Sequence, residues 1–136
     1  MLKDKLNGDV TLVISKNGEI ITSRYHGVRP VLQFLSEGDL LEDADVADRV
    51  IGKASAMLLI KGKVKSVYGQ VMSEAAIQTL EAYGIPYSYG EKVPYIVNND
   101  GTDMCPMEKT VRDIDSLEEA EIALRNKVKE LMSGSK

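Results

Sequence analysis

A regular alternation of strand-like and helix-like segments is the feature of this sequence that most restricts its fold. The chain opens with two runs rich in β-branched residues, 10–15 and 19–25, which are joined across Asn17 and Gly18. Because Asn-Gly is a strong signal for a two-residue β-turn, these runs predict an antiparallel hairpin. The segments that follow must pack around that hairpin.

Helical and extended patterns then alternate to the end of the chain. Pro30 begins a short helix that ends at Gly38. Residues 43–62 predict a second helix, because acidic residues open the segment, apolar residues recur at helical spacing and Gly62 can end it. The remaining elements are a strand at 64–72, a helix at 74–83 capped by Ser73, short strands at 85–89 and 95–97, a helical turn after Cys105, and a final helix with a Ser116 and Glu119 capping box.

This order of elements predicts an α/β fold. Parallel strands need crossover connections, and crossover helices lie on the faces of the sheet. We therefore expect a three-layer α/β/α sandwich with a central mixed sheet of about five strands. A chain of 136 residues with 43% hydrophobic content can bury one core, so residues 1–136 are predicted to form one domain, with 1–8 and 133–136 frayed.

Composition excludes several functional classes. The chain has 17 Lys and Arg against 21 Asp and Glu, and a net charge of -4 argues against a nucleic-acid partner. No segment approaches the roughly 20 apolar residues of a membrane span, and no secretory signal opens the chain. The single cysteine cannot form an internal disulfide, which agrees with a reducing compartment. We expect a cytoplasmic protein that needs no cofactor.

Three segments resemble a family of bacterial and archaeal proteins known only as domain of unknown function 1893. They are GKASAMLLIKGKV at 52–64, SEAAIQTLEAYGIPYSY at 73–89 and CPMEKTV at 105–111. Together with the order of elements, the resemblance covers nearly the whole chain. It implies a divergent branch of the cytidine-deaminase-like fold. These motifs carry no established chemistry.

The implied fold can be tested against the zinc chemistry of deaminases. A zinc deaminase needs a His or Cys with a Glu two residues later at the start of one helix, and a Cys-x-x-Cys pair at the start of the next. The matching segments here read GKAS and SEAA. The chain has one histidine, His26, and one cysteine, Cys105. The sequence therefore predicts no metal site and no zinc-dependent deamination.

Cys105 and Glu108 are the candidate catalytic residues. Because Cys105 precedes Pro106, it is expected at the N-cap of a short helix, where free N–H groups lower the pKa of a thiol. A thiolate there could act as a nucleophile or redox sensor, with Glu108 one turn away and His26 as an imidazole partner. The alternative is a thiol that packs as a small hydrophobe between two methionines.

Lys53, Ser55, Ser73 and Asp103 are the candidate ligand-binding residues. Lys53 could hold an anion in a cleft or extend its ammonium to solvent. Ser73 could bind a phosphate or carboxylate, or could simply cap a helix. The resemblance implies that Ser55 and Ser73 lie where a deaminase-like fold keeps its site, and Asp103 opens the segment that contains Cys105.

Three functional hypotheses follow. The first is a metal-independent enzyme, or the remnant of one, that binds a small nucleotide-like or anionic metabolite and uses Cys105. The second is a non-catalytic ligand-binding or regulatory module. The third is a structural domain that self-associates as a homodimer through an edge strand. Pro94, Lys63 and Lys65 argue against this third hypothesis, because proline and lysine protect the edge of a sheet from pairing. The reactivity of the Cys105 thiol distinguishes the first two.

Overall fold

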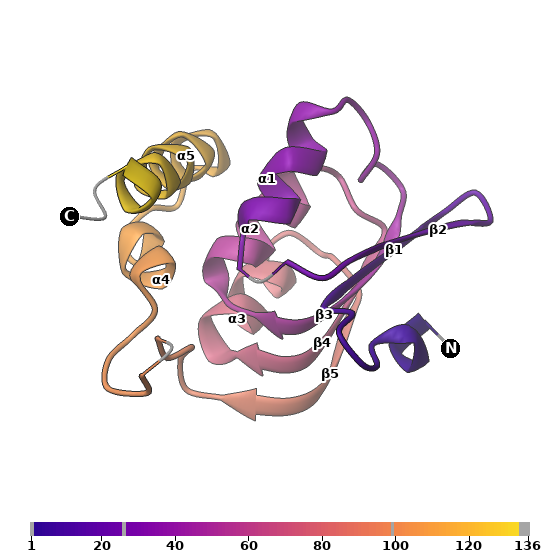
Figure 1. Ribbon diagram of the computed structural model, residues 1–136, viewed down its shortest axis with the longest axis horizontal. Coiled ribbons are helices and arrows are strands. Elements are labelled where there is room, and N and C mark those ends of the chain that lie inside the picture. The colour runs from indigo at the N-terminus through magenta and orange to yellow at the C-terminus, as the bar shows by residue number, and fades with distance from the viewer. Residues whose placement is uncertain (1, 26, 99, 134–136) are drawn as a thin grey trace.

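The described part of the chain folds around one five-stranded mixed sheet. The computed structural model describes residues 2–25, 27–98 and 100–133. The strand order is β2-β1-β3-β4-β5 (Figure 1). Strand β3 pairs antiparallel with β1 and parallel with β4, and β5 continues the sheet parallel to β4. The strands are β1 (Leu12–Lys16), β2 (Glu19–Ser23), β3 (Asp45–Ile51), β4 (Ser66–Ser73) and β5 (Tyr87–Val93).

The predicted hairpin is confirmed. Strands β1 and β2 pair antiparallel, with Lys16 opposite Glu19 at the closed end. Asn17 and Gly18 form the turn with φ angles of 54° and 83°. Two successive positive φ angles are what a type I′ turn requires, and Asn and Gly adopt them at low cost.

The predicted helix at 43–62 is wrong in its first half. Residues Asp45–Ile51 form the central strand β3, and only Lys53–Lys61 form a helix, α2, which starts after Gly52. Val46 and Val50 are spaced as they would be on a helix, but β-branched residues also suit a strand. Pairing with β1 and β4 satisfies the backbone of this segment from both sides, and that partnership is not visible in local sequence.

The other helices agree with their sequence signals. The Ser73 hydroxyl accepts a hydrogen bond of 3.1 Å from the Ala76 N–H, and the Glu119 N–H donates to Ser116 Oγ at 3.2 Å. Cys105 is the N-cap of the short helix after it. These elements are α1 (Arg29–Ser36), α3 (Glu74–Ala82), α4 (Pro106–Val111) and α5 (Leu117–Ser133). The strand predicted at 85–89 is present as β5, Tyr87–Val93, whereas 95–97 is not a strand and has an isolated bridge between Val97 and Met104.

The layers confirm the predicted α/β class. Helix α2 contacts α1 and α3 within one helical layer, and α5 packs against α2 (Figure 1). On the other side of the sheet lies a single turn of 3-10 helix, η1 (Leu2–Lys5), which contacts β1 and β3 and places the Lys3 ammonium 5.7 Å from the centre of the Tyr68 ring. Enclosed between the sheet and α5, helix α2 is buried from Ala54 to Ile60.

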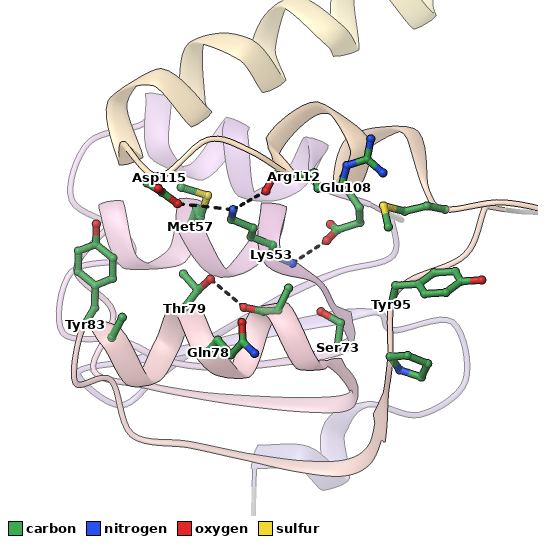
Figure 2. A pocket seen from close by; sticks show the side chains of 14 residues that line it. Lys53, Met57, Ser73, Gln78, Thr79, Tyr83, Tyr95, Glu108, Arg112 and Asp115 are labelled. Carbon is green, nitrogen blue, oxygen red and sulfur yellow. Dashed lines mark hydrogen bonds and ion pairs between the residues drawn. The ribbon is translucent and has the colours of Figure 1, made fainter.

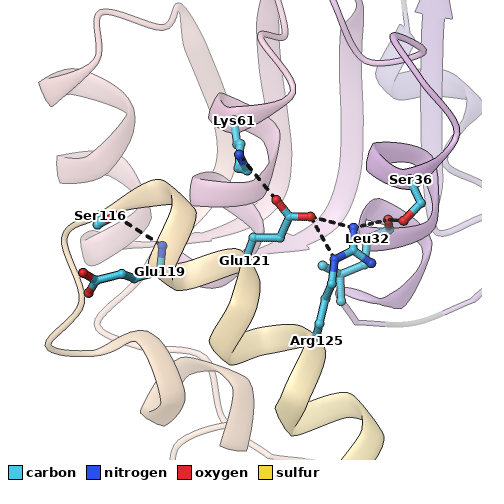
Figure 3. A network of polar contacts seen from close by, with 7 residues as sticks. All are labelled: Leu32, Ser36, Lys61, Ser116, Glu119, Glu121 and Arg125. Carbon is cyan, nitrogen blue, oxygen red and sulfur yellow. Dashed lines mark hydrogen bonds and ion pairs between the residues drawn. The ribbon is translucent and has the colours of Figure 1, made fainter.

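A small polar network fastens α5 to α1 and α2 (Figure 3). Glu121 lies 3.5 Å from the Lys61 ammonium of α2 and 2.7 Å from the guanidinium of Arg125. The same guanidinium donates to the Leu32 carbonyl of α1 at 3.1 Å. Glu121 and Arg125 therefore tie three helices together at the surface of the core.

The two edges of the sheet are β2 and β5. Pro94 directly follows β5, which agrees with its predicted place at an edge. Lys63 and Lys65 precede β4, which is paired on both sides. The interpretation of these two lysines as edge protection is therefore wrong.

Glu108 of α4 caps the N-terminus of α2 across 55 residues of sequence. Its carboxylate accepts hydrogen bonds from the Lys53 N–H at 2.7 Å and from the Ala54 N–H at 3.2 Å. The N-cap of α2 is Gly52, and a Cβ at this position would lie 2.4 Å from Cδ of Glu108. Burial raises the pKa of Glu108, and the two N–H donors and the Lys53 charge oppose that rise. Glycine at 52 therefore leaves room for a carboxylate that replaces the usual side-chain cap.

This contact predicts a strong coupling between positions 52 and 108. Glu108→Ala leaves two partly buried N–H donors without their protein partner, so it should lower the free energy of unfolding by about 1–2 kcal/mol. Glu118→Ala, at an exposed position in the first turn of α5, should change it by less than about 0.5 kcal/mol. Urea denaturation measures both values.

Gly52→Ala completes the test. The backbone at Gly52, with φ of -103° and ψ of -173°, is open to alanine, so the cost of the substitution should come from displacing Glu108. Gly52→Ala should lower the free energy of unfolding of the parent protein clearly, and that of the Glu108→Ala protein much less. Equal costs in the two backgrounds would show that Gly52 and Glu108 act independently.

Candidate functional site

Two cavities meet at the carboxyl edge of the parallel strands, on either side of Glu108. This edge is where ligands usually bind in open α/β sheets. One cavity, of about 590 Å³, lies between α2 and α3 and is called here the α2–α3 cavity. The other, of about 580 Å³, is lined by β3, the start of α2 and Cys105, and is called the Cys105 cavity. Pro94, Tyr95 and Glu108 line both.

The α2–α3 cavity contains two of the predicted ligand-binding residues, Lys53 and Ser73 (Figure 2). The Lys53 ammonium donates to the Arg112 carbonyl at 3.0 Å and lies 3.9 Å from the Asp115 carboxylate. The Ser73 hydroxyl is occupied as the cap of α3. Both groups that sequence reasoning assigned to an anion thus have protein partners.

The Cys105 cavity brings together Ser55, Cys105 and Glu108. Cys105 is half-buried, and its backbone N–H donates to the Ile96 carbonyl at 2.9 Å. Most of the remaining wall is apolar, and it comes from β3, β4, the end of β5 and the segments beside α1 and α4. These apolar residues are Val28, Val50, Val71, Val93, Ile96, Val97 and Met107.

Asp48 is a site residue that sequence reasoning missed. It lies in the middle of β3, lines the Cys105 cavity and is only 8% exposed. Burial raises the pKa of its carboxyl to about 7, and hydrogen bonds with the backbone of Val50 and Arg49 oppose the rise. Assigning this segment to a helix hid the signal, which is an acid in the middle of a central strand that is paired on both sides.

No cation balances Asp48 within the described residues. The neighbouring Arg49 guanidinium donates instead to the carbonyls of Val10 and Gly8, at 2.7 and 2.9 Å. A carboxyl that is buried without a cation pays a desolvation cost when it ionises. Asp48 is therefore held near the midpoint of its titration at neutral pH.

Ser55 is the second buried polar group of this cavity. It is 5% exposed and lines the cavity. Within the described residues no fully buried side-chain oxygen or nitrogen lacks a hydrogen-bond partner, so this hydroxyl is not an orphaned group. From the cavity wall it can still exchange a hydrogen bond with a bound molecule.

The other predicted residues lie elsewhere. Asp103 pairs with the Lys109 ammonium, which lowers the pKa of the Asp103 carboxyl, and it lines neither cavity. His26, the predicted imidazole partner of Cys105, falls outside the described residues. Within the described residues, no three His, Cys, Asp or Glu side chains are grouped so that they could hold a metal ion. The described helices include none with the length and apolarity to cross a membrane.

The buried acid predicts a specific dependence of stability on pH. The folded protein holds a proton on Asp48 up to about pH 7, whereas an unfolded aspartate releases it near its ordinary pKa of 3.8. Between these two pKa values the folded state binds more protons than the unfolded state, so this group's contribution to stability falls as pH rises, by up to about 1.4 kcal/mol per pH unit.

Asp48→Asn should remove this loss. Urea denaturation should therefore show a variant that gains stability over the parent protein between pH 5 and pH 8, while Asp115→Asn, at an exposed position, shows no such trend. A constant difference between Asp48→Asn and the parent across this range would contradict the assignment.

Comparison with known proteins identifies a family without an assigned function. The family model described as "Domain of unknown function (DUF1893)" and named TM1506 matches residues 2–128. No curated protein matches the chain. A similar solved structure is the crystal structure of a DUF1893 family protein, TM1506, from Thermotoga maritima, with 34% sequence identity and a TM-score of 0.81 over 88% of this chain and 81% of that chain.

These findings test the resemblance seen in the sequence. They agree on the family and on the fold of the chain, and they name neither a ligand nor a reaction. They do not name the deaminase fold either, so that likeness stays a prediction. With a family model that spans residues 2–128 and a related structure that is 34% identical, this chain belongs to the DUF1893 family.

Proposed function

We propose that this chain binds a small, largely apolar metabolite in the Cys105 cavity. The observation that carries the proposal is the buried Asp48 carboxyl, which has no cation partner among the described residues, on a mostly apolar wall that also includes the buried side chains of Ser55 and Thr11. Small-molecule sites have this composition, in which apolar contacts supply affinity and a few polar groups fix orientation. A volume of about 580 Å³ also lies within the usual range for such sites.

The charges near this cavity favour a ligand that is not an anion. Its wall contains the carboxyl groups of Asp48 and Glu108, and the Arg49 guanidinium is bound to backbone carbonyls. Lys53, on which the expectation of an anionic or nucleotide-like metabolite depended, lines the other cavity and contacts Asp115. A neutral or cationic molecule therefore fits the Cys105 cavity better.

The location of the cavity also supports the proposed likeness to the deaminase fold. The family resemblance implies a site near helix N-termini for such a fold, and open α/β sheets in general bind ligands at this edge. The Cys105 cavity includes Gly52 and Ser55, at the N-cap and in the first turn of α2. The chemistry would still differ from that of a zinc deaminase, because the polar groups are Asp48 and Ser55.

Reaction at the Cys105 thiol is the second candidate function. The thiol belongs to the same cavity as Asp48, whose pKa near 7 suits proton transfer at neutral pH. A bound molecule with an electrophilic carbon would meet a nucleophile and a proton carrier in one cavity. Binding without reaction needs only the cavity with Asp48 and Ser55 on its wall. We therefore place binding first.

Cys105 gives a direct test of occupancy, because it is the chain's single cysteine and alkylation reports on one position. We expect benzyl alcohol or benzylamine, used as probes, to slow the alkylation of Cys105 by iodoacetamide several-fold, measured by intact-protein mass spectrometry. Ser55→Leu, which fills part of the cavity, should abolish this protection. Ser36→Leu, at an exposed position of α1, should keep it.

The proposal fails if neither probe changes the rate of alkylation in the parent protein. It also fails if protection survives in Ser55→Leu, because the probe would then bind somewhere else. Reaction at the thiol as a function would lose its support if Cys105 in the parent protein reacted more slowly with iodoacetamide than free cysteine at neutral pH.

A further inference from the structure

Asp48 is enclosed by uncharged groups and by a second acid. Its sheet neighbours in register are Leu12 of β1 and Gly69 of β4. Across the cavity, α2 contributes Ser55, and α4 with its N-cap contributes Glu108 and Cys105. The Arg49 guanidinium, beside Asp48 on β3, is held by the carbonyls of Val10 and Gly8. The described part of this cavity therefore has two acids and no cation free to pair with Asp48.

The two acids differ in how their charge is compensated. Glu108 accepts two N–H groups at the positive end of α2, and the Lys53 charge also favours its ionised form. Asp48 has only backbone hydrogen bonds. A buried carboxylate without a counter-charge is unstable, and a cation that enters the cavity would offset the cost of desolvating it.

We propose that the Cys105 cavity selects small organic cations, in which a protonated amine binds Asp48 and an apolar body contacts the valine-lined wall. This inference rests on the proposed function and names the ligand class for the same site. An ammonium has three N–H donors and no acceptor, so it can donate to the Asp48 carboxylate, and its remaining donors suit the Ser55 hydroxyl oxygen on the same wall. Asp48 then gains the counter-charge that its backbone hydrogen bonds do not supply.

Two probes of equal size separate charge from shape. Benzylamine is a cation at pH 8, and benzyl alcohol is its neutral counterpart. Both probes are titrated into the full chain, and binding is followed by the NMR shifts of backbone amides. Both should shift amides of the cavity wall. The dissociation constant of benzylamine should be at least about tenfold lower, because a charge-assisted hydrogen bond stabilises a complex by that factor or more. Lowering the pH to 5 protonates Asp48 and should weaken benzylamine while leaving benzyl alcohol unchanged.

Variants identify the residue responsible. Asp48→Asn keeps the shape of the side chain and removes a buried charge, so it is expected to fold and to lose the preference for benzylamine. Ser55→Ala should reduce the preference in part. Asp48→Asn should also remove the dependence of benzylamine binding on pH, and Glu118→Gln on the surface of α5 is the unaffected control.

The outcomes separate this inference from the proposed function. Equal or tighter binding of benzyl alcohol at pH 8 overturns selection of cations and leaves the binding site intact. A preference for benzylamine that survives in Asp48→Asn overturns the role of Asp48. If neither probe shifts the amides of the cavity wall, the proposed function itself is wrong.

Discussion

The contact between Glu108 and the N-terminus of α2 sets the position of both cavities. Helix α2 is buried from Ala54 to Ile60, so the free N–H groups of its first turn have little access to water and need a protein acceptor. Gly52 cannot supply one, and Glu108 reaches in from α4. The same bonds dock α4 on α2, and this places Cys105, the N-cap of α4, at the edge of the sheet. The wall between the two cavities is thus a structural element of the fold.

This arrangement changes the chemistry expected at the edge of the sheet. The N-terminus of a helix is ordinarily a place for a bound anion. Here a carboxylate of the protein already occupies that place at α2, and Ser73 caps α3 in the usual way. Lys53 is likewise engaged, by Arg112 and Asp115. The groups that suggested an anionic ligand are the ones that hold the fold together, and the groups left for a ligand are Asp48 and Ser55.

Sequence reasoning succeeded where the signal was local and failed where it depended on distant partners. The turn at Asn17 and the caps at Ser73, Cys105 and Ser116 are set within a few residues, and the structure has each of them. Strand β3 depends on pairing with β1 and β4, which the spacing of its valines does not reveal. That error hid Asp48, because an acid on a partly polar helix is expected to face solvent. The middle of a central strand is covered on both sides, and an acid there becomes buried. Cys105 was found because it precedes a proline at a helix start, Glu108 because it lies one turn further on, and Ser55 through the family resemblance. The partnership of Glu108 with α2 was not foreseen.

Burial alone does not mark a functional acid in this protein. Asp48 is buried and Glu108 is half-buried, and both have raised pKa values, with desolvation as the leading cause in each. Glu108 uses its position to satisfy two N–H donors of α2, so its cost of burial is offset within the fold. Asp48 stabilises no helix terminus and pairs with no cation in the described structure, yet it lines a cavity together with Ser55. A fold under selection for stability alone would favour asparagine or an apolar residue at this place in β3. The presence of an acid is therefore best explained by a molecule that enters the cavity and pairs with it.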